Sequence, residues 1–423
     1  MGTTLRSSTV RSRRSDTVTR TTTGPRFGAA VRVIAVAQVA ASTAAGLVLT
    51  TASVAAVELA GTEQVAGTTQ TAMVIGASVL TVPIARRSSR SGRRAALTLA
   101  YGIASAGALI AAAAVGLGLW WLLVLGAALI GGGTVAGLAA RFAAADSAPS
   151  ADRTASVIAF VLWASTVGSL VGPNLASLTG STGAATFLLP AALYAAAAAC
   201  IRGGMPPTPA TFEPARRRGT RPEALGVLRA HPRALAGVVV STASHGAMIA
   251  LMALAPVHLH AAGQHTSAVG LVMSAHLAAM YGFSPVFGAL VRHCGALRCG
   301  VAALALAASA SGVLAVGAQG GVVLFGVGLA LLGAAWSLGM IAGSTLVTLG
   351  LPTDQRAAAQ GLTDLLLNVG GGVASMTAGL VAAAVGYPTL GVGTAALVTC
   401  CLVALLPIGR RRLGPTEHTG APR

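Results

Sequence analysis

The chain has 423 residues, of which 54% are hydrophobic and only 9% are charged, and its mean hydropathy is +0.77. So few charged side chains cannot cover a soluble protein of this length, so the composition excludes an ordinary soluble domain and places the chain in lipid. The formal net charge is +18, but the basic residues are spread along the chain, so we expect anionic lipid headgroups as a partner and no nucleic acid.

Every basic residue is an arginine, and the 28 arginines occupy alternate gaps between long apolar segments or the segment ends beside those gaps. The arginine-bearing gaps lie within residues 6–32, 86–94, 141–153, 202–233, 292–298, 356 and 410–423. The intervening gaps, near residues 59–66, 116–119, 176–182, 257–266, 317–320 and 385–390, carry none. Because basic residues beside a span stay inside, the pattern predicts that both termini are cytoplasmic.

Apolar segments long enough to span a bilayer follow one another along the chain. A hydrocarbon layer about 30 Å thick needs about 20 apolar residues in a helix. The sequence predicts twelve such helices, near residues 31–57, 67–85, 95–115, 119–140, 154–175, 183–201, 234–256, 267–291, 298–316, 321–346, 357–384 and 391–408. The expected fold is therefore an all-α membrane protein with twelve transmembrane helices.

The longest polar interval, residues 203–233, is rich in proline and arginine and separates six predicted spans from six more. We expect a cytoplasmic linker between two six-helix bundles, with a short surface helix near residues 222–228. The expected division is a disordered cytoplasmic tail at 1–27, a first bundle at 28–202, the linker at 203–233, a second bundle at 234–408 and a tail at 409–423.

The segment ARRSSRSGRR, at residues 85–94, resembles the signature loop of the major facilitator superfamily, Gly-x-x-x-Asp-Arg-x-Gly-Arg-Arg. The residues that match are Arg90, Gly92, Arg93 and Arg94. Ala85 and Ser89 stand where the family has glycine and aspartate. The resemblance implies cytoplasmic charge contacts that hold one transport state, and Ser89 cannot supply the carboxylate of such a contact.

A second copy of this loop in the other half supports an internal repeat. Placing Gly92 on Gly295 aligns two loops that each follow a helix running inward, and the second copy keeps Gly288 and Gly295. Arg292 stands where the family often has aspartate. Two parallel halves related by an axis along the membrane normal are one way to build a transporter with a central site.

Gly168, Gly172 and Pro173, in the fifth predicted span, resemble the Gly-x-x-x-Gly-Pro motif of the family's drug/proton antiporters. Glycines four residues apart lie on one helix face and permit close helix approach, while proline removes a backbone hydrogen bond and bends the helix. Ordinary glycine-mediated packing explains the same spacing. The antiporters' arginine in the fourth span is missing, since its expected position near Ala127 is uncharged.

Asp364 is an ionisable residue inside the eleventh predicted span, where such residues usually face a cavity or a partner. Gln360 and Asn368, each four residues away, lie on the same helix face. Burial disfavours a charged carboxylate, so Asp364 is a candidate carrier of the coupling proton. A structural carboxylate near the inner gate is the alternative.

His245 and His276 lie near the expected membrane midplane, and methionines follow on the same helix faces. Imidazole titrates near neutral pH and methionine adapts to irregular apolar ligands, so both histidines are candidates for substrate binding and for proton relay. A histidine satisfied by packing is the alternative for each. The full predicted substrate-binding set is Gln38, Trp163, Asn174, His245, Met248, His276, Met280, Trp336 and Asn368.

These patterns favour a secondary transporter that exports a small amphipathic or apolar molecule in exchange for protons. Uptake of a metabolite, coupled to protons or facilitated, is the alternative within transport. No GxxxxGK[ST] nucleotide-binding loop is present, so we expect no ATP-driven step and no cofactor. The five cysteines show no metal-ligand spacing, so we expect no metal.

Other classes of protein are disfavoured. The predicted spans contain no carboxylate pair and no nucleophile beside a base, which argues against a membrane enzyme. The short tails argue against a non-transporting sensor. We therefore expect a multi-pass protein of the cytoplasmic membrane that acts as a monomer on a small-molecule substrate.

Overall fold

The computed structural model describes residues 28–62, 65, 68–179, 183–207 and 221–410, nearly all of them in helices. The first five helices are α1 (Ala29–Ala60), α2 (Thr68–Leu117), α3 (Trp120–Asp146), α4 (Thr154–Thr179), which the short turn η2 (Ala151–Arg153) precedes, and α5 (Ala185–Gly204). The others are α6 (Arg221–Ala230), α7 (Pro232–Met252), α8 (Ala255–Ala261), α9 (Thr266–Leu277), the π-helical turn η3 (Ala278–Gly282), α10 (Ser284–Cys294), α11 (Ala296–Gly320), α12 (Val322–Leu349) and α13 (Thr353–Arg410).

The described residues confirm a helical membrane protein. Nine of their helices are long and apolar enough to cross a bilayer, and the bent pair α9–α10 makes a tenth if it forms one span. α2 has 50 residues and α13 has 58. A straight helix of 50 residues would be about 75 Å long, more than twice the thickness of the hydrocarbon layer.

Both long helices are interrupted at a glycine. Gly92 in α2 has φ 81° and ψ 170°, and Gly386 in α13 has φ 84° and ψ 164°. Gly295, between α10 and α11, has φ 88° and ψ 143°. Glycine adopts a positive φ without the steric cost that other residues pay. Gly92 and Gly295, which the sequence repeat aligns, therefore share one backbone conformation.

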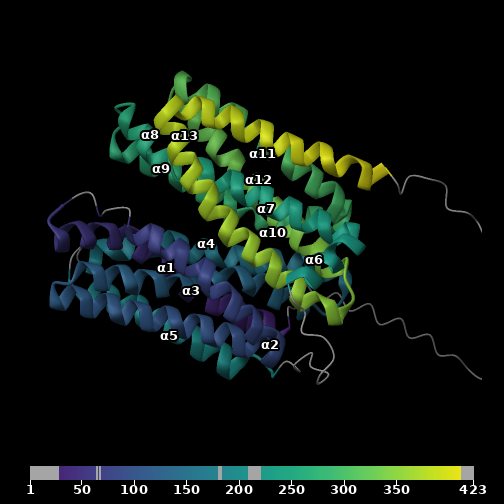
Figure 1. The fold of residues 1–423 in the computed structure, drawn as a ribbon, viewed down its shortest axis with the longest axis horizontal. Coiled ribbons are helices and arrows are strands. Elements are labelled where there is room, and N and C mark those ends of the chain that lie inside the picture. Colours follow the sequence, from purple (N-terminus) through teal and green to yellow (C-terminus); the bar gives the residue numbers. More distant parts are fainter. Residues whose placement is uncertain (1–27, 63–64, 66–67, 180–182, 208–220, 411–423) are drawn as a thin grey trace, which may run out of the picture.

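The helices form two groups that lie side by side (Figure 1). α1–α5 pack on one another, while α7 packs on α11, α12 and α13. The groups touch where α13 contacts α2 and where α10 contacts α4. The short helix α6 lies inside the polar interval 203–233, where the sequence predicts a surface helix.

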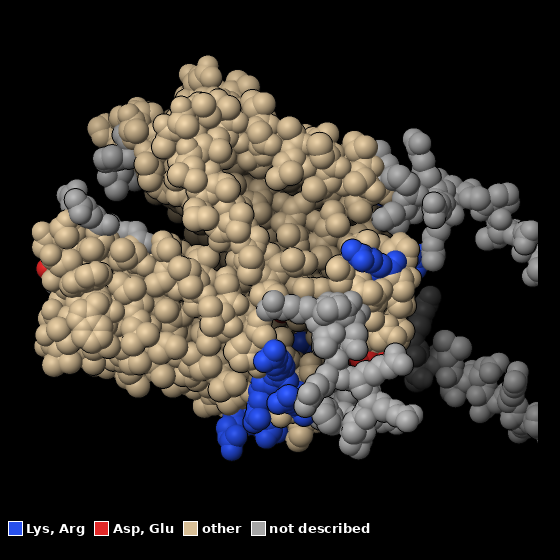
Figure 2. Space-filling view, viewed as in Figure 1, with Lys and Arg blue, Asp and Glu red and all other residues tan. Residues whose placement is uncertain are grey.

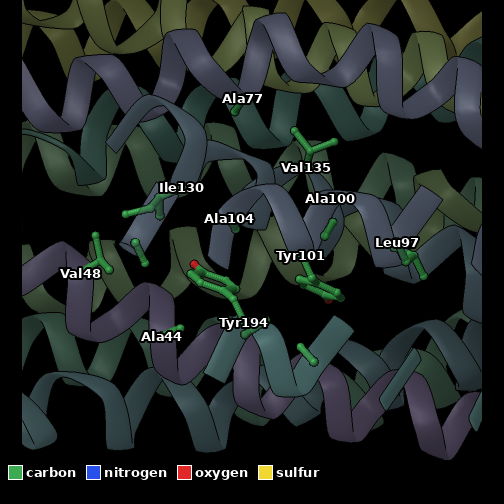
Figure 3. Close-up of a cluster of buried hydrophobic side chains, with 14 of the residues drawn as sticks. Ala44, Val48, Ala77, Leu97, Ala100, Tyr101, Ala104, Ile130, Val135 and Tyr194 are labelled. Carbon is green, nitrogen blue, oxygen red and sulfur yellow. The ribbon is translucent and has the colours of Figure 1, made fainter. Parts of the chain in front are cut away.

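Small side chains and two buried tyrosines form the core of the first group (Figure 3). Tyr101 of α2 and Tyr194 of α5 lie among alanine and aliphatic side chains. A Cβ atom on Gly133 would lie 2.6 Å from Cε1 of Tyr194, so this ring rests directly on the α3 backbone. Small residues let helices approach closely where lipid supplies no hydrophobic driving force between them.

Gly168 and Gly172 bring α4 against α1. A Cβ atom on Gly168 would lie 2.5 Å from the backbone nitrogen of Thr43 and 2.6 Å from the carbonyl oxygen of Val39. A Cβ atom on Gly172 would lie 2.5 Å from the carbonyl oxygen of Thr43. The Gly-x-x-x-Gly spacing therefore serves close packing within the first group.

Gly168→Ala is expected to destabilise the protein, because the added Cβ atom meets backbone atoms that cannot move aside. Overpacking of this kind typically costs about 1–3 kcal/mol. The thermal unfolding midpoint of the purified protein measures the effect. Gly102→Ala is the matched control, since a Cβ atom on Gly102 has nothing within 4 Å. Equal midpoints for the two variants would show that α1 and α4 are less tightly packed than described.

Candidate functional site

A buried ion pair joins the two helix groups. Nη2 of Arg141 in α3 lies 2.8 Å from Oδ1 of Asp364 in α13. Nε of Arg141 donates a hydrogen bond of 2.8 Å to Oγ of Ser344 in α12. The Arg141 side chain is 0% exposed and that of Asp364 is 7% exposed. Each ion has lost most of its hydration, so removing either partner would leave an uncompensated buried charge.

Apolar packing seals this contact. The guanidinium carbon of Arg141 lies 4.6 Å from the centre of the Phe142 ring. Phe142 is buried with Leu228 of α6, Ala234 of α7 and Val347 of α12. The last turns of α3 therefore insert into the second group and carry the arginine with them.

The polar row of α13 makes further contacts on both sides of Asp364. Nδ2 of Asn368 donates to Oγ1 of Thr81 in α2 at 3.2 Å. Nε2 of Gln360 donates to Oγ1 of Thr348 in α12 at 3.3 Å. Asp364 and Asn368 thus face the first group, whereas Gln360 is held within the second.

The signature loop makes its charge contact within the first group. Nε of Arg93 lies 2.9 Å from Oδ2 of Asp146 at the end of α3, and Nη1 of Arg93 donates to Oγ of Ser88 at 3.3 Å. Ser89 donates to the carbonyl oxygen of Ala85 in its own helix. Among the described residues, the ion pair between the two groups comes from Arg141 instead of from this loop.

The other arginines of the loop differ in their surroundings. Nη1 of Arg94 donates to the carbonyl oxygen of Met205 at 3.3 Å, so it ties the loop to the residue after α5. Arg90 is exposed. Figure 2 shows arginine side chains near one end of the visible face and none over the other end.

A cavity adjoins the ion pair on the side of the signature loop. It is small, with a volume of about 20 Å³, and Asp364, Arg93, Ser88 and Thr81 supply its polar lining. Nη2 of Arg93 is buried without a hydrogen-bond partner among the described residues. The carboxylate of Asp364 therefore lies between the buried guanidinium of Arg141 and this polar cavity.

The structure brings several predicted binding residues together in the second group. Nε1 of Trp336 donates a 3.0 Å hydrogen bond to Nδ1 of His245, and the Tyr281 ring meets Trp336 edge-on with 5.6 Å between centroids. Met248 and Met280 are buried in the same cluster as Trp336. α4 of the first group contributes apolar side chains to this cluster, so it lies at the boundary between the groups.

His276 is held apart from His245. Its Nδ1 lies 2.7 Å from the carbonyl oxygen of Leu329, and its Nε2 is buried without a partner in the described structure. Leu329 and Trp336 are seven residues apart on α12, which is about 10 Å along a helix. The two histidines thus bind the same helix at different levels.

The predicted residues of the first group fall into separate places. Nε2 of Gln38 donates to Oγ of Ser165 at 3.1 Å, and the Tyr101 hydroxyl donates to Oε1 of Gln38 at 3.3 Å. Trp163 is 41% exposed and stacks on Phe160. The side chains of Pro173 and Asn174 lie outside the described residues.

Gly288 brings the two groups into contact. A Cβ atom there would lie 2.5 Å from Cβ of Ala159 in α4. This glycine, predicted as part of the second signature loop, therefore packs α10 against the first group.

The sequence pattern placed Arg141 in a gap after the fourth predicted span, but the residue lies inside a helix. The fourth span was expected to end near residue 140, whereas α3 continues to Asp146 and buries Arg141 completely. The run Phe142–Ala145 after the arginine is apolar, and it is the signal that could have extended the helix.

The arrangement of two helix groups, a glycine-turned signature loop and a charged contact between the groups agrees with comparison to known proteins. The sequence profile of the Major Facilitator Superfamily matches residues 34–265. The chain belongs to the Major Facilitator Superfamily. It is thus a member of a family of multi-pass membrane transporters, as the signature loop predicted.

Individual members of the superfamily resemble the chain over most of its length. It is 29% identical over 381 residues to the uncharacterized MFS-type transporter YdeG of Bacillus subtilis, covering 85% of this chain and 86% of YdeG. It is 28% identical over 342 residues to the riboflavin transporter RfnT of Brucella anthropi, covering 78% and 83%. The human organic anion transporter MFSD10 has the same fold, with a TM-score of 0.74 at 16% identity, covering 90% of this chain and 100% of that one.

Asp364→Asn is expected to loosen the contact between the groups, because Arg141 would lose its counter-charge in a buried place. Losing one partner of a buried pair costs about 3–5 kcal/mol, so we expect a rise of at least about tenfold in the accessibility of nearby residues. The measurement is the rate at which a maleimide labels Ala85→Cys, in the cavity wall, in nanodisc-embedded protein without its native cysteines.

Asp152→Asn is the control for this labelling. Asp152 also pairs with an arginine, Arg153, but its side chain is 67% exposed. It should leave the labelling rate unchanged. A rate that responds equally to both variants, or to neither, would contradict a role for Asp364 in holding the two helix groups together.

Proposed function

We propose that this chain is a secondary active transporter that exports a small molecule across the cytoplasmic membrane by alternating access, in exchange for protons. The observation that carries the proposal is the buried ion pair between Arg141 and Asp364. It closes the contact between the two helix groups and involves a group that can be neutralised by one proton. Such a contact can open and close without a nucleotide or a covalent step.

The proposed membrane arrangement has twelve crossings in two bundles, residues 28–202 and 234–408, joined by the linker at 203–233. α2 and α13 each supply two crossings that meet at Gly92 and Gly386, and α9 with α10 supplies one. With the remaining long helices, this gives six crossings before the linker and six after it. The arginine-rich gaps and both termini then lie in the cytoplasm.

Accessibility tags at residues 210 and 262 test this topology. We expect the tag at 210 to be reached only from the cytoplasm and the tag at 262 only from outside, because an odd number of crossings separates them. The measurement is labelling of intact and permeabilised cells with an impermeant reagent. Finding both tags on one face would contradict the twelve-crossing arrangement.

The conformation supports an outward-facing state. Figure 2 shows the surface hollowed between the two masses at the end away from the arginines. At the arginine-bearing end, Arg141, Phe142 and Gly288 keep the groups in contact. In alternating access, this contact must break before the substrate path opens to the cytoplasm.

Protonation of Asp364 supplies a reason for the contact to break. A neutral carboxylic acid no longer compensates Arg141, whose guanidinium stays charged. Separation of the groups would hydrate Arg141 and remove this penalty. A proton taken up by Asp364 would therefore favour the opposite state, which is the coupling that an exchanger needs.

Uptake of a metabolite is the second candidate. The similarity to the riboflavin transporter RfnT, over 78% of this chain, favours a metabolite as the substrate. The same ion pair between Arg141 and Asp364 can serve import if substrate and proton move in the same direction. Riboflavin therefore belongs in the panel of substrates that we would test.

In proteoliposomes, Asp364→Asn is expected to abolish substrate accumulation driven by a pH gradient while leaving equilibrium exchange, because the variant cannot carry a proton at this site. Fluxes of a substrate panel under gradients of either sign measure this and give the direction. Asp152→Asn is again the control. Unchanged pH dependence in the Asp364 variant would remove it as the carrier, and the absence of any flux would overturn transport itself.

A further inference from the structure

A cluster in the second helix group combines three aromatic rings with two free polar atoms. The rings belong to His245 of α7, Trp336 of α12 and Tyr281 of the turn η3. Nε2 of His245 and Oη of Tyr281 have no hydrogen-bond partner among the described residues, and both residues are partly exposed. Both atoms are therefore open to a ligand.

The hydrogen bond from Trp336 fixes the tautomer of His245. An indole N–H can only donate, so Nδ1 of His245 must accept. The neutral imidazole then carries its proton on Nε2, and this atom becomes a donor. Protonation of Nδ1 would place its new N–H against the N–H of Trp336, and the hydrogen bond between the two residues would be lost. The contact therefore favours a neutral histidine whose free edge donates.

Two backbone features border this cluster. Nε2 of His245 faces Gly371 of α13, where a Cβ atom would lie only 3.2 Å away. The second feature is η3, a π-helical turn, after which the chain bends by 41° into α10. π-helical turns often occur at functional sites, and here the turn carries Tyr281 to the Trp336 ring.

The charges around the cluster disfavour a cation. The packed neighbours of Trp336 are apolar, with Met248, Met280 and Leu162 among them. The carboxylate of Asp364 is already paired with Arg141. A positively charged ligand would therefore find no free carboxylate in this cluster to offset its charge.

We propose that His245, Trp336 and Tyr281 bind a planar heteroaromatic substrate that carries a hydrogen-bond acceptor in its ring system and no positive charge. The ring lies against the aromatic side chains and accepts a hydrogen bond from Nε2 of His245. This inference rests on the proposed function, since it names the substrate class of the transporter. It also narrows that class, because hydrophobic cations are excluded.

Three probes with the same bicyclic skeleton test the site: naphthalene, quinoline and N-methylquinolinium. Naphthalene lacks the acceptor, quinoline has it, and N-methylquinolinium replaces it with a positive charge. The measurement is quenching of Trp336 fluorescence in nanodiscs, with the other three tryptophans changed to phenylalanine and with protein-free nanodiscs to correct for partitioning. Quinoline should bind about fivefold more tightly than naphthalene, the factor for one neutral hydrogen bond. N-methylquinolinium should bind at least about tenfold more weakly than quinoline.

His245→Phe should abolish the preference for quinoline over naphthalene while keeping naphthalene binding, because the ring remains and the donor is lost. His258→Phe is the matched control: this histidine stacks on Phe325 and Tyr387 and should leave the preference intact. Gly371→Ala is an independent variant that should weaken both aromatic probes by filling the space beside Nε2.

The outcomes separate this inference from the transport proposal. Equal binding of quinoline and N-methylquinolinium, or a preference that persists in His245→Phe, would overturn the site. If the protein transports a substrate in proteoliposomes but does not discriminate among the three probes, the transport proposal stands and the proposed binding site is wrong. Discrimination among the probes without any flux would support the site and count against transport.

Discussion

A guanidinium group that is buried in a protein interior needs a counter-charge, and this constraint governs the contact between the two halves of the molecule. Arg141 is carried by α3 in the first half, but its counter-charge, Asp364, belongs to α13 in the second. The penalty for an unpaired buried ion is several kcal/mol. Contact between the halves and ionisation of Asp364 are therefore linked: each favours the other.

The remaining contacts between the halves are suited to separation. Gly288 meets Ala159, Phe142 packs on aliphatic side chains, and Asn368 shares one neutral hydrogen bond with Thr81. Apolar contacts between helices gain little over contacts with lipid, because lipid tails are equally apolar. Much of the free-energy difference between closed and open contact then falls on the ion pair, so one protonation can decide it.

The sequence predicted the helical membrane fold well, because spans and arginine-bearing gaps are local patterns. It did not predict the ion pair, because the partners are 223 residues apart and because α3 continues six residues past its expected end near residue 140. Periodicity indicated that Asp364 and Asn368 share a face, but it could not say which helix that face meets. The pairing of His245 with Trp336 likewise required the packing of α7 on α12.

Because Asp364 is paired with Arg141, it limits which ligands the aromatic cluster of His245, Trp336 and Tyr281 can recognise. A carboxylate held by Arg141 is not available to a ligand, so recognition falls to neutral donors and rings such as His245 and Tyr281. Gly371, which faces His245, follows Asp364 by seven residues, or about 10 Å, on nearly the same face of α13. The contact with His245 and the ion pair with Arg141 therefore both belong to α13, so the cluster and the contact between the halves act on one helix.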